Sequence, residues 1–194
     1  PHGHEILYLN PWRTEPWNRL FRWATQLGEP LAFVFFGLLS ALWRFRFAAL
    51  IALAGLILPP LSYVLKDKIG TDRPITHFNH TGLRDAVVTV PEVELNGGQT
   101  SFPSGHTTAA FCMYGLMALM SRKRWPALGL FWFGLAFLVA FSRVFLVQHF
   151  LIDVLGGAAL GLFLSLLVWE INVRYLEKWP VLNRGLLPAA RNTA

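Results

Sequence analysis

Five segments of the chain are runs of apolar residues, separated by polar and charged residues. The segments are residues 30–43, 47–65, 107–120, 126–147 and 151–169. A helix of about 20 residues, rising about 1.5 Å per residue, covers the ~30 Å hydrocarbon core of a bilayer. The first and third segments are shorter, but a turn of amphipathic flank extends each of them. The pattern therefore predicts an all-α integral membrane protein with a bundle of about five transmembrane helices.

Basic residues in the loops on one side of these segments predict the orientation of the bundle. They are Arg44 and Arg46, then Arg122, Lys123 and Arg124, and finally Arg174, Lys178, Arg184 and Arg191. Because cytoplasmic loops are enriched in Lys and Arg, this side is predicted to be cytoplasmic, with residues 170–194 as a cytoplasmic tail. Only Glu170 and Glu177 of the 11 acidic residues fall there. The net charge of +6 therefore reflects the basic residues of the cytoplasmic side, and no nucleic-acid partner is predicted.

The N-terminal region contains an amphipathic segment. Residues 17–27 (WNRLFRWATQL) place aromatic residues and two arginines at roughly helical spacing. This suits an interfacial helix in the headgroup layer, and equally an extension of the first span. We treat 1–194 as one membrane-embedded domain, with 1–29 as an extracytoplasmic N-terminal segment. Since five spans and a cytoplasmic tail leave Pro1 outside, we expect a sixth helix in the full-length protein, ahead of this chain.

Composition excludes an ordinary soluble domain. Hydrophobic residues make up 54% of the 194 residues and charged residues only 14%. The single cysteine, Cys112, lies within a predicted span, so neither an intrachain disulfide nor a cysteine-based metal site is predicted. We predict no metal and no cofactor, and the sequence makes no prediction of oligomeric state.

Ionisable and polar residues gather at the outer ends of the predicted helices. They are Lys66, Arg73, Ser104, His106, Arg143, His149 and Asp153. An ionisable group at membrane depth costs about 2.5–3.5 kcal/mol on insertion scales and usually marks function. Each has a structural alternative: Arg143 could anchor its helix at the interface, Lys66 could be an ordinary interface residue, and His149 with Asp153 could be a structural pair. Their occurrence together on one membrane face favours a site.

The spacing of these residues suggests what the site binds. His149 and Asp153 are four apart, so on a helix they would share a face, and the carboxylate would activate the imidazole. Ser104 is placed to cap the helix that begins at Gly105, and a helix start attracts anions. Three cations, Lys66 and the two arginines, add fixed positive charge. We predict a phosphate site, and its position at the bilayer edge indicates a lipid phosphate.

Three stretches carry a resemblance to a known family. They are KDKIGTDRP at 66–74, PSGH at 103–106 and SRVFLVQHFLID at 142–153. In this order they resemble the three signature motifs of the type 2 phosphatidic acid phosphatase superfamily, K-x6-R-P, P-S-G-H and S-R-x5-H-x3-D. All three match fully, and the resemblance extends over residues 30–169.

The resemblance implies a role for each matching residue. His149 would attack phosphorus and form a phosphohistidine, with Asp153 orienting its ring. His106 would protonate the leaving oxygen and then activate water. The phosphate oxygens would be held by Lys66, Arg73, Ser104, Gly105 and Arg143. The implied enzyme is a metal-independent lipid phosphatase, which in a bacterium would lie in the inner membrane with its site facing the periplasm.

Three functions remain open at this stage. The leading one is hydrolysis of undecaprenyl diphosphate, phosphatidylglycerol phosphate, phosphatidic acid or the phosphate of lipid A. A lipid-to-lipid phosphotransferase would use the same intermediate with another acceptor. A vanadium haloperoxidase would hold vanadate in the same constellation, but those relatives are soluble and larger.

Other features concern the helices and the longest connection. Residues 75–102 form an extracytoplasmic loop, long enough to act as a lid or to contact the substrate. Within it, His77 and His80 are read as part of a polar surface in preference to a metal pair. Pro59 and Pro60 are expected to kink the second span, and Gly157 with Gly161 forms a small-xxx-small pair that lets another helix approach.

Overall fold

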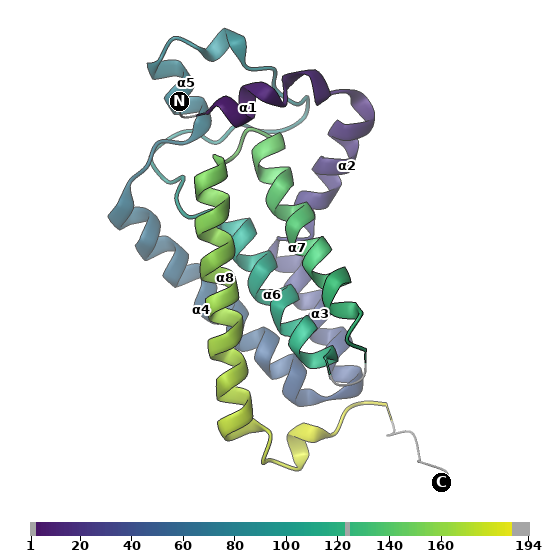
Figure 1. The fold of residues 1–194 in the computed structure, drawn as a ribbon. Coiled ribbons are helices and arrows are strands. Elements are labelled where there is room, and N and C mark those ends of the chain that lie inside the picture. The colour runs from purple at the N-terminus through teal and green to yellow at the C-terminus, as the bar shows by residue number, and fades with distance from the viewer. Residues whose placement is uncertain (1–2, 123–124, 188–194) are drawn as a thin grey trace.

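The computed structural model describes residues 3–122 and 125–187, and all regular structure in these ranges is helical (Figure 1). The longer helices are α2 (Glu15–Gln26), α3 (Pro30–Trp43), α4 (Phe45–Ile69), α6 (Gly105–Ser121), α7 (Leu128–Phe145) and α8 (Leu151–Ile171). The shorter ones are α1 (His4–Tyr8), η1 (Asn10–Trp12), α5 (Pro74–His80), η2 (Arg84–Ala86), a π-helical turn η3 (Asn172–Leu176) and η4 (Val181–Asn183). Pro1, Lys123, Arg124 and Arg191, which entered the topology prediction, lie outside the described residues.

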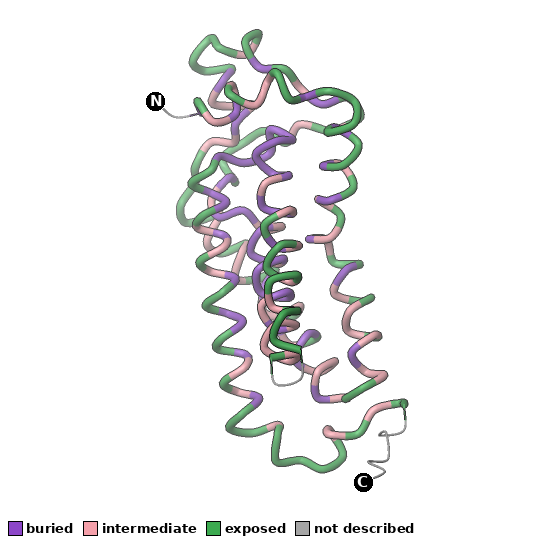
Figure 2. The backbone as a smooth tube through the Cα atoms, turned by 45° about the vertical axis from the view of Figure 1, so that its right-hand side comes forward, coloured by how far each residue is buried: buried purple, intermediate pink, exposed green. Residues whose placement is uncertain are grey.

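The bundle is built around α6. Its side chains from Ala110 to Tyr114 are almost fully buried, and it packs against α4, α7 and α8. The outer faces of the surrounding helices expose large apolar residues, such as Phe131 on α7 and Phe163 on α8. In Figure 2 buried positions follow the inner faces, and exposed positions follow the outer faces. An apolar outer surface around a buried centre is the arrangement of an integral membrane protein.

The five predicted helices are found as α3, α4, α6, α7 and α8. Within residues 3–122 and 125–187, three segments are long and apolar enough to cross a membrane: Phe45–His80, Leu128–Phe145 and Leu151–Leu176. The pair α2 and α3 meets the same criterion only together, and α6 has 17 residues. The fold class is therefore confirmed, while two of the five predicted helices are shorter than a full membrane span.

Helix α2 is neither a straight extension of the first span nor separate from the bundle. It meets α3 at 61°, with the break at residues 27–29. Its Phe21 ring packs 4.4 Å from the ring of Phe145 on α7, whereas Trp17 and Trp23 are exposed. The short polar break and Pro30 at the start of α3 end one helix and begin the next, which accounts for the bend.

Gly157 and Gly161 allow a close contact between α8 and α6, as predicted for a small-xxx-small pair. A Cβ on Gly157 would lie 2.7 Å from the carbonyl oxygen of Ser104, and one on Gly161 would lie 2.5 Å from that of Thr108. Helix α8 therefore approaches α6 at backbone distance, which only glycine allows. At the other predicted irregularity, α4 continues as one helix through Pro59 and Pro60, and it runs obliquely across the bundle in Figure 1.

The connections gather at the end of the bundle where α6 and α8 begin. Helix α1 and residues 70–104 lie over this end, α2 descends from it beside α7, and the C-terminal segment lies at the opposite end (Figure 1). Arg13 fastens the N-terminal segment there, since its Nε donates to the carbonyl of Phe145 at 2.9 Å. At the opposite end, buried Arg46 forms an ion pair with Glu177 at 3.2 Å.

Candidate active site

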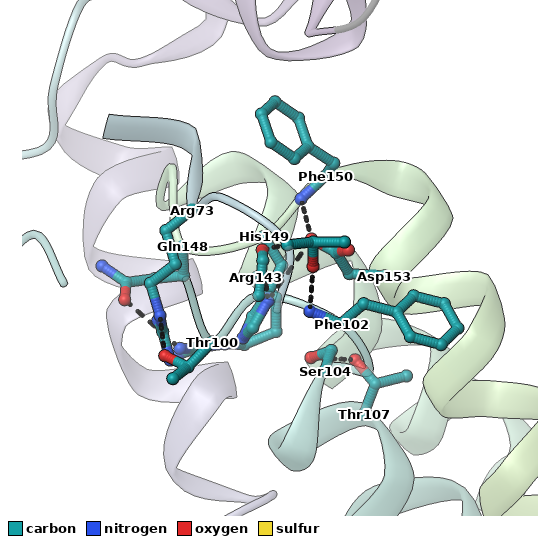
Figure 3. A network of polar contacts seen from close by, with 12 residues as sticks. Arg73, Thr100, Phe102, Ser104, Thr107, Arg143, Gln148, His149, Phe150 and Asp153 are labelled. Atoms are coloured by element: carbon teal, nitrogen blue, oxygen red, sulfur yellow. Dashed lines mark hydrogen bonds and ion pairs between the residues drawn. The ribbon is translucent and has the colours of Figure 1, made fainter. Parts of the chain in front are cut away.

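The predicted site residues come from separate elements that meet near the starts of α6 and α8. Figure 3 shows five of them close together: Arg73, Ser104, Arg143, His149 and Asp153. Lys66 lies in the last turn of α4, and Arg73 is the N-cap of α5. Ser104, Gly105 and His106 form the start of α6. Arg143 lies in the last turn of α7, His149 in the turn that follows, and Asp153 in the first turn of α8. Residues up to 87 positions apart in sequence are thus brought together.

His149 and Asp153 interact, but not across one helix face as predicted. Helix α8 begins at Leu151 with Phe150 as its N-cap, so His149 lies in the preceding turn. The Asp153 carboxylate folds back, accepts a hydrogen bond from the Phe150 amide at 2.8 Å and lies 3.6 Å from Nδ1 of His149. The prediction of a shared helical face was wrong, because the carboxylate serves as a capping group and reaches the histidine from there.

Ser101 contacts both His149 and Asp153, and the sequence did not identify it as a site residue. Its hydroxyl is fully buried, donates to Oδ2 of Asp153 at 2.5 Å and lies 3.4 Å from Nδ1 of His149. The same ring nitrogen therefore faces both Asp153 and Ser101, which leaves Nε2 as the nitrogen that can react with a ligand.

The charge state of His149 follows from its surroundings. The ring is 2% exposed, and this burial is the largest cause that lowers the pKa of His149 below its ordinary value. The positive charges of Arg143, Arg73 and Lys66 lower this pKa further, while the interaction with Asp153 acts in the opposite direction. The imidazole is therefore neutral at pH 7, which is the form that can act as a nucleophile.

The three predicted cations surround the histidine, and the loop before α6 holds two of them. Lys66 donates to the carbonyl of Thr100 at 2.6 Å, and Nε of Arg73 donates to the Thr100 hydroxyl at 3.1 Å. Thr100 is next to Ser101, so one short segment contacts both the cations and the Asp153 carboxylate. The end of the long loop thus contacts two of the predicted site residues, Lys66 and Arg73, while a role of this loop as a lid or in substrate contact stays a prediction.

Arg143 is fixed from two directions. Its Nη1 donates to the hydroxyl of Thr25 at 2.6 Å, and its Nη2 lies 3.5 Å from Oε1 of Gln148. Gln148 is in turn held by the side chain of Asn96 at 2.8 Å and by the carbonyl of Glu94 at 2.9 Å. The guanidinium is only 6% exposed, so a buried positive charge is oriented by neutral oxygens.

Two guanidinium nitrogens at the site are buried and have no hydrogen-bond partner in the described part of the chain. They are Nη1 of Arg73 and Nε of Arg143. Leaving a buried donor unsatisfied costs about 1–3 kcal/mol, so such atoms call for an explanation. Two unpaired cationic donors beside a neutral histidine are what an oxyanion would satisfy.

The start of α6 offers room for such an anion. Ser104 is the N-cap, as predicted, but its side chain makes no capping hydrogen bond, and its hydroxyl accepts one from Thr107 at 2.9 Å. A Cβ added to Gly105 would meet no atom within 4 Å, so the helix start is open there. A helix of 17 residues presents unpaired amide donors at such an end.

His106 lies beside the same cations. Its electrostatic neighbours include Arg143, His149, Lys66 and Arg73. Its Nε2 is 3.8 Å from a carboxylate oxygen of Glu29, which the sequence analysis did not single out. Motif matching could not identify the other residues that contact the site, because none of them occupies a specified position of the three motifs: Thr25, Glu29, Thr100, Ser101 and Gln148.

His77 and His80 of the long loop have other contacts than a shared metal ion. His80 Nδ1 lies 3.2 Å from a carboxylate oxygen of Asp72, and the His77 ring packs 5.5 Å from that of Phe150. In residues 3–122 and 125–187, no group of three or more His, Cys, Asp or Glu side chains could hold a metal ion.

An open cleft of about 580 Å³ adjoins His77 and Asp153, but Lys66, Arg73 and Arg143 do not line it.

Comparison with known proteins agrees with the geometry. The family model described as the PAP2 superfamily matches residues 41–176. Phosphatidylglycerophosphatase B of Bacillus subtilis is 44% identical over 75 residues, which are 35% of this chain and 37% of that protein. Undecaprenyl-diphosphatase BcrC of Bacillus subtilis is 29% identical over 146 residues, 70% of this chain and 66% of that protein. The matches thus cover less than two thirds of these relatives' lengths.

Two crystal structures have a similar fold. One is a transmembrane PAP2 type phosphatidylglycerolphosphate phosphatase from Bacillus subtilis, with a TM-score of 0.71 and 27% identity, covering 89% of this chain and 85% of that one. The other is Aquifex aeolicus LpxE, with a TM-score of 0.73 and 22% identity, covering 87% of this chain and 94% of that one. Since the family model matches well over half of the residues, the chain belongs to the PAP2 superfamily.

Proposed function

We propose that this protein hydrolyses a phosphate monoester or diphosphate on a membrane lipid, through a phosphohistidine formed on His149. The observation that carries the proposal is the pair of buried, unpaired guanidinium nitrogens of Arg73 and Arg143 next to a neutral imidazole. Relatives named as a phosphatidylglycerophosphatase and an undecaprenyl-diphosphatase support the reaction class.

The first step transfers the phosphoryl group to the enzyme. Nε2 of His149 attacks phosphorus, the bond between phosphorus and the leaving oxygen breaks, and protonated His106 gives its proton to that oxygen. Negative charge spreads over the equatorial oxygens, where Lys66, Arg73 and Arg143 stabilise it together with the amides that begin α6. Asp153 stabilises the positive charge that develops on the His149 ring.

The second step regenerates the enzyme. Neutral His106 takes a proton from water, and the resulting hydroxide attacks the phosphohistidine. The bond between phosphorus and Nε2 breaks, inorganic phosphate leaves, and the electron pair returns to His149. A covalent intermediate divides one difficult displacement into two easier ones. The scheme uses no metal ion, because the phosphate charge is met by fixed cations.

The position of the site supports a lipid substrate on the extracytoplasmic face. The site lies at one end of the bundle, and basic residues Arg44, Arg122 and Arg174 lie towards the opposite end, which the positive-inside rule makes cytoplasmic. We infer that in a bacterium the site faces the periplasm from the inner membrane. The substrate then belongs to the lipid phosphates or diphosphates exposed there, with undecaprenyl diphosphate and phosphatidylglycerol phosphate as the first candidates.

The experiment that tests this function is phosphate release by the purified protein in detergent micelles. The substrates are undecaprenyl diphosphate, phosphatidylglycerol phosphate, phosphatidic acid and lipid A, each with and without EDTA. We expect release from at least one lipid, unchanged by EDTA and abolished by His149→Ala. Analysis of the lipid products separates hydrolysis from transfer to a second lipid. Normal turnover by folded His149→Ala, or complete loss of activity in EDTA, would overturn the scheme.

A further inference from the structure

The corner between α2 and α3 contacts two residues of the proposed site, although it precedes the segment that the family model matches. The corner consists of Thr25, Gly28 and Glu29. A Cβ on Gly28 would lie 2.7 Å from Cγ1 of Val139 on α7 and 3.0 Å from the carbonyl oxygen of His106. The corner is therefore packed at backbone distance between α6 and α7, directly beside the histidine.

Thr25 orients the phosphate-binding arginine. Its hydroxyl accepts the 2.6 Å hydrogen bond from Nη1 of Arg143, across 118 positions of the sequence. Gln148 approaches the other terminal nitrogen, Nη2, at 3.5 Å, and Nε is the buried nitrogen without a partner. With both terminal nitrogens engaged on the protein side, the rotation of the guanidinium plane is limited and Nε is left for the ligand.

Glu29 faces the acid–base histidine. It is the N-cap residue of α3, and its Oε1 lies 3.8 Å from Nε2 of His106, with the two side chains 42% and 33% exposed. The other charged groups around His106 are Lys66 on α4, Arg73 at α5, Arg143 on α7 and the titratable His149. Glu29 is the one carboxylate placed next to this ring in the described part of the chain. Burial of the ring is the largest effect that disfavours protonation of His106, and the three cations act in the same direction, so a carboxylate beside the ring opposes them.

We propose that the α2–α3 corner positions the reacting groups of this site: Glu29 favours the protonated form of His106 that the first step needs, and Thr25 holds Arg143 in its phosphate-binding orientation. The inference rests on the proposed function, because it assigns the proton donation to His106. Neither Glu29 nor Thr25 touches the reacting atoms, so both are positioning residues. Folding of the N-terminal segment onto the bundle is then a condition for catalysis.

The role of Glu29 has a consequence that depends on the leaving group. A carboxylate beside an imidazole stabilises the imidazolium, and the proton of that imidazolium is needed most when the leaving oxygen is strongly basic. A lipid phosphate releases an alcohol and needs the proton. An aryl phosphate with an electron-poor ring releases a stable phenolate and needs it little.

The first test compares Glu29→Gln on these two substrates, phosphatidic acid and p-nitrophenyl phosphate. We expect kcat on phosphatidic acid to fall about tenfold, with a much smaller fall on the aryl phosphate, and the alkaline limb of the lipid profile to move to lower pH by about one unit. Equal losses on both substrates with an unchanged profile, or no loss on either, would overturn the role of Glu29. Glu15→Gln, on the exposed side of α2 where Glu15 pairs with Arg19, is the matched control.

The second test concerns Thr25. Thr25→Val removes the hydroxyl while keeping the shape, and Thr25→Ser keeps the hydroxyl. We expect KM for the lipid phosphate to rise about tenfold in Thr25→Val and to return to near the original value in Thr25→Ser. An unchanged KM in Thr25→Val, or failure of Thr25→Ser to rescue it, would contradict the role of this hydroxyl.

One further variant separates this inference from the function on which it rests. His149→Ala is assayed beside the corner variants on the same lipid. Full activity of His149→Ala would remove the proposed function itself. An inactive His149→Ala together with unaltered corner variants would leave the function intact and overturn only the role of the α2–α3 corner.

Discussion

Ser101 donates its hydroxyl hydrogen to Oδ2 of Asp153 at 2.5 Å, and that carboxylate also accepts the Phe150 amide. The serine precedes α6 by four residues, and the aspartate lies in the first turn of α8. This bond links the loop before the second motif to the aspartate of the third. It fixes the carboxylate that faces His149, so the proposed nucleophile depends on a residue outside all three motifs.

Replacing Ser101 therefore weakens catalysis. A hydrogen bond to a charged group contributes about 1.5–3 kcal/mol, so we expect Ser101→Ala to lower kcat about tenfold to a hundredfold. Steady-state kinetics on a lipid phosphate measures this. Ser121→Ala, which removes a hydroxyl bonded within α6, should change kcat little. A Ser101→Ala enzyme with the original kcat would contradict the link.

Arg143 cannot be replaced by lysine without loss. Lysine keeps the charge but lacks the fork that reaches Thr25, Gln148 and a ligand together. We expect Arg143→Lys to lower kcat/KM about 100-fold, equivalent to about 2.7 kcal/mol. The control is Arg122→Lys, because Arg122 lies over the Trp169 ring away from the site. If kcat/KM fell equally in Arg143→Lys and Arg122→Lys, the loss would not come from the hydrogen bonds of the Arg143 guanidinium, and the prediction would be contradicted.

The acidic side of the pH profile reports the state of His149. In the proposed mechanism the His149 ring must be neutral to attack, and burial lowers the pKa of His149 below the ordinary value of about 6.5. As the pH falls, activity should therefore persist below 6.5 and decline only when the lowered pKa is reached. The measurement is kcat/KM against pH, which reports the free enzyme. An acidic limb at or above pH 6.5 would contradict the assignment.

Packing between α6 and α8 gives a stability prediction with an internal control. A Cβ on Gly161 would lie 2.5 Å from a backbone oxygen, whereas one on Gly134 of α7 would meet no atom within 4 Å. Overpacking costs about 1–3 kcal/mol, so Gly161→Ala should lower the melting temperature in detergent by several degrees. Gly134→Ala should leave it unchanged or raise it, since alanine favours helix. Equal effects would contradict the close approach.

Much of the fold was predictable because it depends on local features. The apolar runs located the helices, and the small-xxx-small pair located the contact between α6 and α8. The bend of α2 against α3 was not predicted, because residues 17–27 read equally as an extension of the first span. Helix α4 continues through Pro59 and Pro60 without a break, so the two prolines do not divide the span.

The site was predictable only as far as its motifs extend. The turn that carries His149 includes Val147 with φ of 59°, a left-handed conformation that is unfavourable for a β-branched residue. No glycine or asparagine marks this turn, so His149 was placed on a helix with Asp153. Thr25, Ser101 and Gln148 contact the site across long sequence separations, so no local spacing could reveal them.

The stereochemical course at phosphorus tests the central claim most directly. A lipid thiophosphate made chiral with 16O and 18O is hydrolysed in water labelled with 17O, and the configuration of the released thiophosphate is determined. Attack by His149 followed by attack of water inverts phosphorus twice, so the account predicts overall retention. Inversion would mean that water displaces the lipid in a single step, and it would contradict the phosphohistidine.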